Sequence, residues 1–169
     1  ACLVGSEMCI RDRSIITDCT ANLTKQPILT HINASKTTIV SKSEKYNELA
    51  EKGQLGTLET HTMIEGGATK DDMVWLYDNK FVADGGRKYY DKIKAIPKYS
   101  KCPFCGVGIV STLDHYLPKT KYPTYALTPV NLIACCADCN KNKKSEISET
   151  RNNEFIHPYY DDFNDEVWL

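Results

Sequence analysis

Long apolar runs are absent from the sequence. No stretch approaches the roughly 18 consecutive apolar residues that a membrane-spanning helix needs. The start, Cys2 to Arg13, also lacks the basic beginning and sustained apolar core of a secretion signal. Residue usage is ordinary, with 41% hydrophobic and 25% charged residues among 169. We therefore expect a soluble, cytoplasmic protein without a membrane partner, long enough for one domain with a core.

Both ends of the chain are unusual. The string CLVGSEMCIRDR resembles one reading frame of a transposase adapter used in preparing sequencing libraries. We therefore interpret residues 1–13 as an adapter-derived artefact and exclude them from the expected fold. The chain stops within the apolar run Val167-Trp168-Leu169, which reads as the opening of a further element. We expect truncation at both ends.

The net charge of −1 is small but unevenly distributed. Residues 79–144 hold 12 Lys and Arg against 4 Asp and Glu, whereas residues 1–78 hold 8 against 11. The acidic C-terminal segment, residues 146–169, follows this basic centre. A basic centre of this size suits a polyanion-binding site, and a set of solvated lysines is the alternative.

Residues 14–70 form a weakly patterned N-terminal segment. Thr, Ser and Asn are frequent there, and only residues 42–52 (KSEKYNELAEK) predict a helix, which Gly53 stops. Residues 71–100 form a helical region. There Thr69 or Asp71 is expected to cap a first helix, Gly85-Gly86 to interrupt it, and Pro97 to end a second helix.

Residues 101–145 change to short strands and turns. Residues 107–113 suit a strand rich in β-branched side chains, and 131–135 suit a second strand. A proline-punctuated loop over 116–129 separates them, and residues 136–144 begin a helix. The predicted fold class is therefore α+β, a strand-strand-helix module preceded by a mainly helical N-terminal region.

Cysteines are concentrated in this module. Without Cys2 and Cys9, six remain, and four of them form two Cys-x2-Cys pairs flanked by lysines. Such pairs in a reducing cytosol favour a tetrahedral, structural Zn²⁺ site over disulfides. The x2 spacing favours Cys136 over Cys135 as a ligand, and Cys19 is most simply a free thiol. The expected zinc ligands are Cys102, Cys105, Cys136 and Cys139.

Four polar residues stand between and beside these pairs: Asp114-His115, Asn131 and Asn140. Together with the cysteine pairs they resemble the motif of the HNH, or His-Me finger, endonuclease superfamily, whose fold is a ββα-metal module. The match spans Lys101 to Ser145. More narrowly, STLDHYLPKTKYP, TPVNLIACCADCNKNK and HPYYDD are similar to HNH nucleases that accompany an ATPase in Septu and retron-type anti-phage systems.

The chemistry of phosphodiester hydrolysis assigns roles to these residues. A water must be activated, and a histidine near its ordinary pKa is the natural base, which we predict is His115. Asp114 and Asn140 are expected to bind a catalytic Mg²⁺ or Mn²⁺ through oxygen atoms. The resemblance implies that Asn131 is architectural, its amide tying down the loop after the first strand so that His115 is held in place.

The predicted function is metal-dependent hydrolysis of DNA, expected to be double-stranded. The resemblance implies 5′-phosphate and 3′-hydroxyl products, an ATPase partner protein and a role in anti-phage defence. A zinc-stabilised nucleic-acid-binding module without catalysis is one alternative, and an RNase using the same site is another. His157 is expected to pack rather than react. The lysines expected near phosphates are Lys119, Lys121, Lys141, Lys143 and Lys144.

Overall fold

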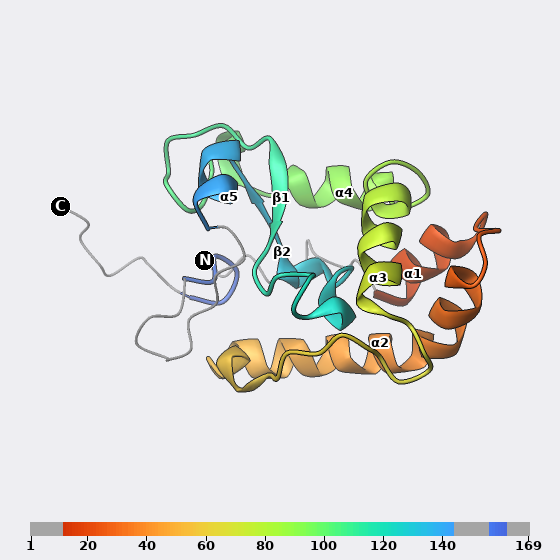
Figure 1. Ribbon diagram of the computed structural model, residues 1–169. Helices are drawn as coiled ribbons and strands as arrows, with labels where there is room; N and C mark the ends of the chain where they lie inside the picture. The colour runs from red at the N-terminus through yellow and green to blue at the C-terminus, as the bar shows by residue number, and fades with distance from the viewer. Residues whose placement is uncertain (1–11, 144–155, 162–169) are drawn as a thin grey trace.

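The computed structural model describes residues 12–143 and 156–161 (Figure 1). This part of the chain is an α+β structure, as predicted, in which helices surround a two-stranded antiparallel sheet. None of its helices is both long and apolar enough to cross a membrane. Residues 1–11, Lys144 and most of the acidic segment 146–169 lie outside the described ranges. The principal elements are α1 (Asp12–Thr20), α2 (Ile28–Glu51), α3 (Lys70–Leu76), α4 (Arg87–Lys94), β1 (Thr112–His115), β2 (Leu132–Cys135) and α5 (Ala137–Lys143).

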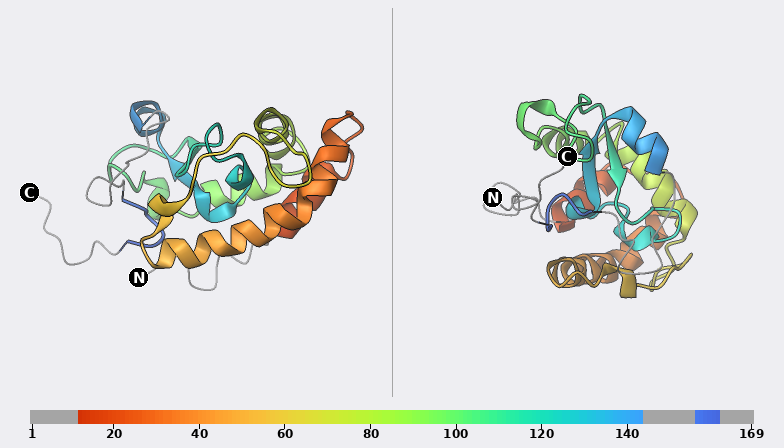
Figure 2. Two further views of the ribbon diagram at one scale, coloured as in Figure 1. Left: turned by 60° about the horizontal axis from the view of Figure 1, so that its bottom comes forward. Right: turned by 90° about the vertical axis from the view of Figure 1, so that its left-hand side faces the viewer.

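The longest helix, α2, was largely missed by the sequence analysis, which predicted a helix only over 42–52. It has 24 residues and runs along one side of the molecule, beside the sheet and α3 (Figures 1 and 2). Its buried positions recur at intervals of three and four, as one face of a helix requires. The stripe was hard to recognise because it contains polar residues. Its members are Ile28, Ile32, Ser35, Ile39, Ser43, Tyr46 and Ala50.

The helical region 71–100 folds as predicted into two helices with a glycine turn between them. Thr69 caps α3: its side chain accepts a hydrogen bond from Asp72 N–H, and the Asp72 carboxylate accepts one from Thr69 N–H. A π-helical turn, Tyr77–Phe81, extends α3. Helix α4 then packs against both strands. This arrangement brings Tyr77 against the end of β1.

The sheet is a hairpin in which Asp114 pairs with Ile133 and His115 with Leu132. The predicted strand over 107–113 was wrong in its bounds, because residues 101–109 fold back on themselves around the cysteines. Lys101 and Ile109 form an isolated bridge there, and the continuous strand begins only at Thr112. The second strand and the helix after it lie within one or two residues of their predicted bounds.

The hairpin is packed on both faces. Leu113, Leu132 and Ala134 join the apolar cluster formed with α1, α3 and α4. Ile133 joins a second cluster that includes Tyr46 of α2 and is rich in tyrosine. The strand ends that carry Asp114 and His115 are therefore held rigidly between two cores.

Candidate functional site

The four cysteines predicted as zinc ligands come together. The Sγ atoms of Cys102, Cys105, Cys136 and Cys139 all lie within 4.8 Å of one another, and none forms a disulfide. Tetrahedral zinc with Zn–S bonds of about 2.3 Å needs sulfur atoms about 3.8 Å apart. The donor set and its size therefore fit a structural Zn²⁺, and four thiolates leave no coordination position for substrate.

Two glycines allow the backbone to turn this tightly. Gly106 has φ of 68°, a conformation that glycine adopts without steric cost. A Cβ atom at Gly108 would lie 2.8 Å from Cys136 Sγ, so only glycine lets the backbone pass the cluster at this position. Gly108 N–H also donates to Cys105 Sγ at 3.3 Å. Backbone hydrogen bonds from Gly108 first, and then from Val107, lower the pKa of the Cys105 thiol to about 6, which favours the thiolate form that binds metal.

The described ranges hold two further cysteines, Cys19 and Cys135, and Cys135 packs against Cys102 and Cys136 without being one of the four converging thiols. Cys135 is fully buried in β2, and burial raises the pKa of its thiol to about 12. Cys19 is a buried free thiol of α1 whose pKa is raised to about 12 for the same reason. Both therefore act as small apolar core residues.

Asp114 is buried at the end of β1 and faces α5. Burial raises the pKa of its carboxyl group, and the ammonium of Lys143 opposes that effect. The Lys143 Nζ atom lies 2.8 Å from Asp114 Oδ2. Beyond this ammonium, no hydrogen-bond partner of Oδ2 is found within the described ranges. A carboxylate oxygen in this state retains its capacity to bind a cation.

His115 is also buried, and its ring orientation is defined. Its Nε2 atom lies 3.0 Å from the carbonyl oxygen of Ala126. A carbonyl only accepts, so Nε2 carries the hydrogen and Nδ1 carries the lone pair. The ring edge contacts Tyr77, with centroids 4.5 Å apart. The expectation of an ordinary pKa was wrong: burial first, and then the positive charge of Lys119, lowers the pKa of His115 to about 3.

Asn131 ends the loop before β2 and is fully buried. Its Oδ1 atom accepts hydrogen bonds from Leu117 N–H at 2.7 Å and from the Tyr46 hydroxyl at 3.1 Å. Its Nδ2 atom donates to the carbonyls of Leu117 at 3.1 Å and Tyr125 at 3.0 Å. The amide thus uses its full hydrogen-bonding capacity to tie down the loop that follows His115.

The sequence analysis did not predict that Tyr46 and His157 are hydrogen-bond partners in this network. Tyr46 of α2 donates its hydroxyl hydrogen to Asn131 and lies 3.2 Å from His157 Nε2. Because His157 Nδ1 accepts from Tyr159 N–H at 3.4 Å, His157 Nε2 carries the hydrogen and donates to Tyr46. The histidine packs, as predicted, and burial lowers its pKa to about 3. A chain of hydrogen bonds therefore joins the C-terminal segment to Asn131.

Asn140 lies on α5, which packs against β1. Its side chain is partly exposed, and it precedes Lys143 by three residues, so both point from one face of the helix. This is the face that reaches Asp114, because Lys143 contacts Asp114 from it. The structure thus brings the helix that carries Asn140 to the strand that carries Asp114 and His115.

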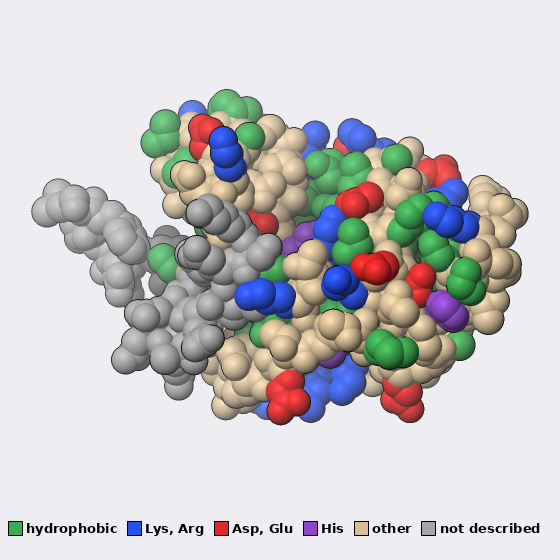
Figure 3. Space-filling view, viewed as in Figure 1, with side chains coloured by type: hydrophobic (Ala, Val, Ile, Leu, Met, Phe, Trp, Pro, Cys, Tyr) green, Lys and Arg blue, Asp and Glu red, His purple; other side chains and the backbone are tan. Residues whose placement is uncertain are grey.

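The predicted phosphate-contacting lysines differ in their environments. Lys121 and Lys141 are exposed. Lys119 forms an ion pair with Asp78 at 2.6 Å. Lys143 is 7% exposed, so its predicted role as a solvent-facing phosphate contact was wrong. Basic and acidic side chains alternate on the face shown in Figure 3, so ion pairs partly neutralise the basic centre.

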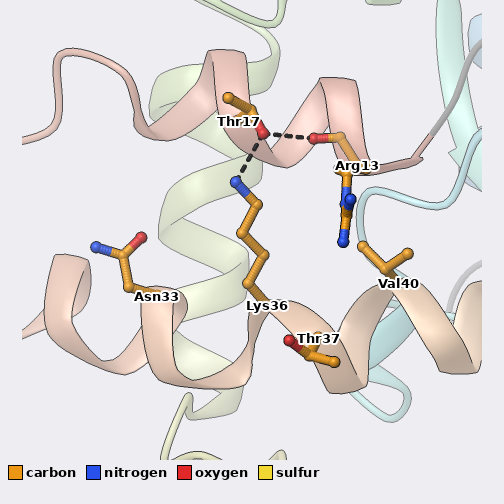
Figure 4. Close-up of a pocket in the computed structure, with 6 residues that line it drawn as sticks. All are labelled: Arg13, Thr17, Asn33, Lys36, Thr37 and Val40. Atoms are coloured by element: carbon orange, nitrogen blue, oxygen red, sulfur yellow. Dashed lines mark hydrogen bonds between the residues drawn. The ribbon is translucent and has the colours of Figure 1, made fainter.

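A separate shallow hollow lies between α1 and α2 (Figure 4). Its Lys36 Nζ donates to Thr17 Oγ1 at 2.6 Å, and Arg13 faces the same space. Neither a carboxylate nor a histidine lines it, and it draws no residue from the cysteine-containing module. It therefore lacks the groups that hydrolytic chemistry needs.

Comparison with known proteins finds a clear similarity to a phage protein. The chain is 35% identical to protein ea31 of Escherichia phage lambda over 134 residues, which cover 73% of this chain and 45% of that protein. It therefore spans a little under half the length of ea31. No family model matches the chain. No solved structure matches it either. The protein is a distant homologue of lambda ea31 that contains a four-cysteine cluster beside a strand-strand-helix module.

Proposed function

We propose that this chain is a metal-dependent HNH-type endonuclease that hydrolyses phosphodiester bonds of double-stranded DNA. The observation that carries the proposal is the fixed tautomer of His115: Nε2 donates to the Ala126 carbonyl, which leaves the lone pair on Nδ1. Asp114, which supplies the carboxylate, is the residue before His115 in β1. A base and a cation-binding oxygen on consecutive residues at a strand end are groups that attack of water on a phosphodiester needs.

His115 is the proposed general base. Its Nδ1 atom accepts a proton from water as the water oxygen bonds to phosphorus and the bond from phosphorus to the 3′-oxygen breaks. The departing 3′-oxygen takes up a proton from solvent water, His115 returns its proton to solvent, and the products carry a 5′-phosphate and a 3′-hydroxyl. A nearby anionic phosphate favours the protonated imidazole, so substrate binding raises the pKa of His115 from its value of about 3 toward the neutral range.

The residues around Asp114 fit a hard divalent cation. Asp114 Oδ2 is buried beside the Lys143 ammonium, and two main-chain carbonyls converge on the same positively charged group. We propose that Asp114 and the amide oxygen of Asn140 hold Mg²⁺ or Mn²⁺. When bound, the ion neutralises charge that develops on the phosphate and the leaving oxygen. The four-cysteine site is separate and structural.

Asn131 and Tyr46 are proposed to position the base rather than to react. Asn131 ties down Leu117 and Tyr125, which flank the loop that supplies the Ala126 carbonyl to His115. Tyr46 in turn fixes the Asn131 amide. Loosening either residue should displace the imidazole before it alters any reacting atom.

The substrate and biological setting are part of the proposal. The basic residues 79–144 suit a nucleic acid. The resemblance to Septu and retron-type nucleases extends the proposal to an ATPase partner and to anti-phage defence. The absence of an ATPase gene beside the gene for this protein would count against that extension.

The proposal is tested by supplying the zinc-loaded protein with four substrates: supercoiled plasmid, linear duplex DNA, single-stranded DNA and RNA. Each is incubated with Mg²⁺, with Mn²⁺, and without any added ion after zinc loading. We expect cleavage of duplex DNA that requires the added ion. Cleavage confined to RNA would replace the proposal by a ribonuclease that uses the same residues, and no cleavage of any substrate would count against hydrolysis.

A second candidate function is a zinc-stabilised module that binds nucleic acid without cutting it. One observation favours it: the Lys143 ammonium lies at the carboxylate assigned to the catalytic ion. Electrophoretic mobility shifts with the same substrates separate the two functions. Salt-sensitive binding to duplex DNA, with no cleavage in the presence of either Mg²⁺ or Mn²⁺, would support the binding module.

A further inference from the structure

Lys143 is buried in a position where lysine is rarely found. Its side chain is 6% exposed, and its Nζ atom lies 2.6 Å from the carbonyl oxygen of His115 and 3.1 Å from that of Tyr116. The third neighbour is Asp114 Oδ2 at 2.8 Å. One ammonium group therefore occupies a site made of one carboxylate oxygen and two carbonyl oxygens.

These three oxygens form a cation site with a single negative charge. A lysine ammonium balances that charge, and its three N–H groups match the three oxygens in number. A divalent ion bound by the same carboxylate would meet a positive charge at contact distance in a site with little water. Such repulsion is weakly screened in a buried position, so the ammonium and the ion exclude each other from Asp114.

Lys143 is well placed to leave this site. Its four methylene groups allow the ammonium to swing into solvent while the stem remains on the protein surface. The preceding turn, which carries Cys139, is anchored by the cysteine cluster and need not move.

We propose that Lys143 is a tethered cation that fills the metal site in the resting protein and is displaced when a divalent ion binds Asp114. The inference rests on the proposed function because that function assigns Asp114 to the ion. Displacement also moves a positive charge from the buried carboxylate to the rim of the site. Binding of the ion is therefore opposed by an ion pair that must first break.

The first test measures Mn²⁺ affinity of the zinc-loaded, full-length chain by electron paramagnetic resonance. Lys143→Met removes the charge and keeps the length of the side chain. We expect it to bind Mn²⁺ roughly tenfold more tightly or better, because no buried ion pair must break. Lys141→Met, an exposed lysine on the same helix, is the matched control and should bind as the parent does. The proposal is overturned if Lys143→Met binds Mn²⁺ no more tightly than the parent does. It is also overturned if neither the parent nor Lys143→Met binds Mn²⁺.

The second test uses the unaltered protein and so does not depend on folding of a variant. Amine-reactive labelling, measured by mass spectrometry, should modify Lys143 slowly without added ion and several times faster with saturating Mg²⁺. Labelling of Lys141 should be the same in both conditions. Protection of Lys143 that persists at saturating Mg²⁺ overturns the proposal.

These measurements require no nucleic acid, which separates this inference from the proposed function. A protein that releases Lys143 on binding Mg²⁺ but cleaves no substrate would keep the inference and lose the nuclease. A protein that cleaves DNA while Lys143 stays protected would keep the nuclease and lose the inference.

Discussion

Replacement of Tyr46 by phenylalanine should weaken the fold through the loop that holds the base. The hydroxyl donates to Asn131 Oδ1 at 3.1 Å and accepts from His157 Nε2 at 3.2 Å. Each hydrogen bond contributes about 0.5–1.5 kcal/mol to stability, and an abandoned buried donor costs about 1–3 kcal/mol. Tyr46→Phe leaves the His157 N–H in this state. We therefore expect a loss of roughly 2–4 kcal/mol, a large part of the ~5–15 kcal/mol of a typical domain.

The assay is urea denaturation of the zinc-loaded protein, followed by circular dichroism at pH 7.5. Tyr99→Phe is the matched control, since its side chain is 80% exposed and the same atom is removed. A surface change of this kind should alter stability by less than about 0.5 kcal/mol. If Tyr46→Phe also stayed within about 0.5 kcal/mol of the parent, the hydroxyl would not connect α2 to Asn131 as described.

Three further predictions concern the zinc site and the buried histidine. Removal of zinc by a strong chelator should unfold the cysteine-containing module, because structural zinc contributes about 10–16 kcal/mol; an unchanged far-ultraviolet spectrum after verified metal loss would contradict this. Gly108→Ala should weaken zinc binding measured by competition with a chromogenic chelator, since its Cβ would lie 2.8 Å from Cys136 Sγ, and an unaltered competition curve would show that the backbone at Gly108 can move away. His157 has a folded pKa of about 3, below its unfolded value of 6.5, so the unfolded chain binds more protons and stability falls as pH drops below about 6.5. Between pH 7.5 and 5.5 the parent should lose roughly 1.4 kcal/mol more than His157→Gln in urea denaturation, and parallel pH dependences would refute a buried neutral histidine.

The parts of the fold predicted correctly from the sequence are those with local signals. Two Cys-x2-Cys pairs predict a cluster because adjacent thiolates on tight turns can bind one ion, and the four sulfur atoms do converge. The capping of α3 could also be recognised, since Thr69 stands three residues before Asp72. Local spacing is sufficient in both cases.

The long helix α2 had no such signal. Its buried stripe contains Ser35, Ser43 and Tyr46, which a search for apolar periodicity passes over. Their hydroxyl groups have partners far along the chain: Ser43 donates to Thr128, and Tyr46 contacts Asn131 and His157. Only the folded structure shows why polar residues belong on that face.

Lys143 shows a second kind of limit. Lysine is almost never fully buried, so the sequence alone favours a solvent-facing role near phosphates. Its burial depends on Asp114, which lies on another element and becomes a neighbour only when α5 packs on β1. The lowered pKa of His115 has the same origin, since desolvation by the surrounding core is invisible in sequence spacing.

The central claim is that His115 is the base of a nuclease, and single-turnover cleavage of supercoiled plasmid tests it most directly. Parent, His115→Ala and His31→Ala are compared at one Mn²⁺ concentration after equal zinc content has been verified. The control residue His31 lies on α2, and its ring contacts Asp72 of α3. General-base catalysis contributes about 10²–10⁴ in rate, so His115→Ala should lose roughly that factor while His31→Ala cleaves as the parent does. Cleavage by His115→Ala at the rate of the parent would contradict the account.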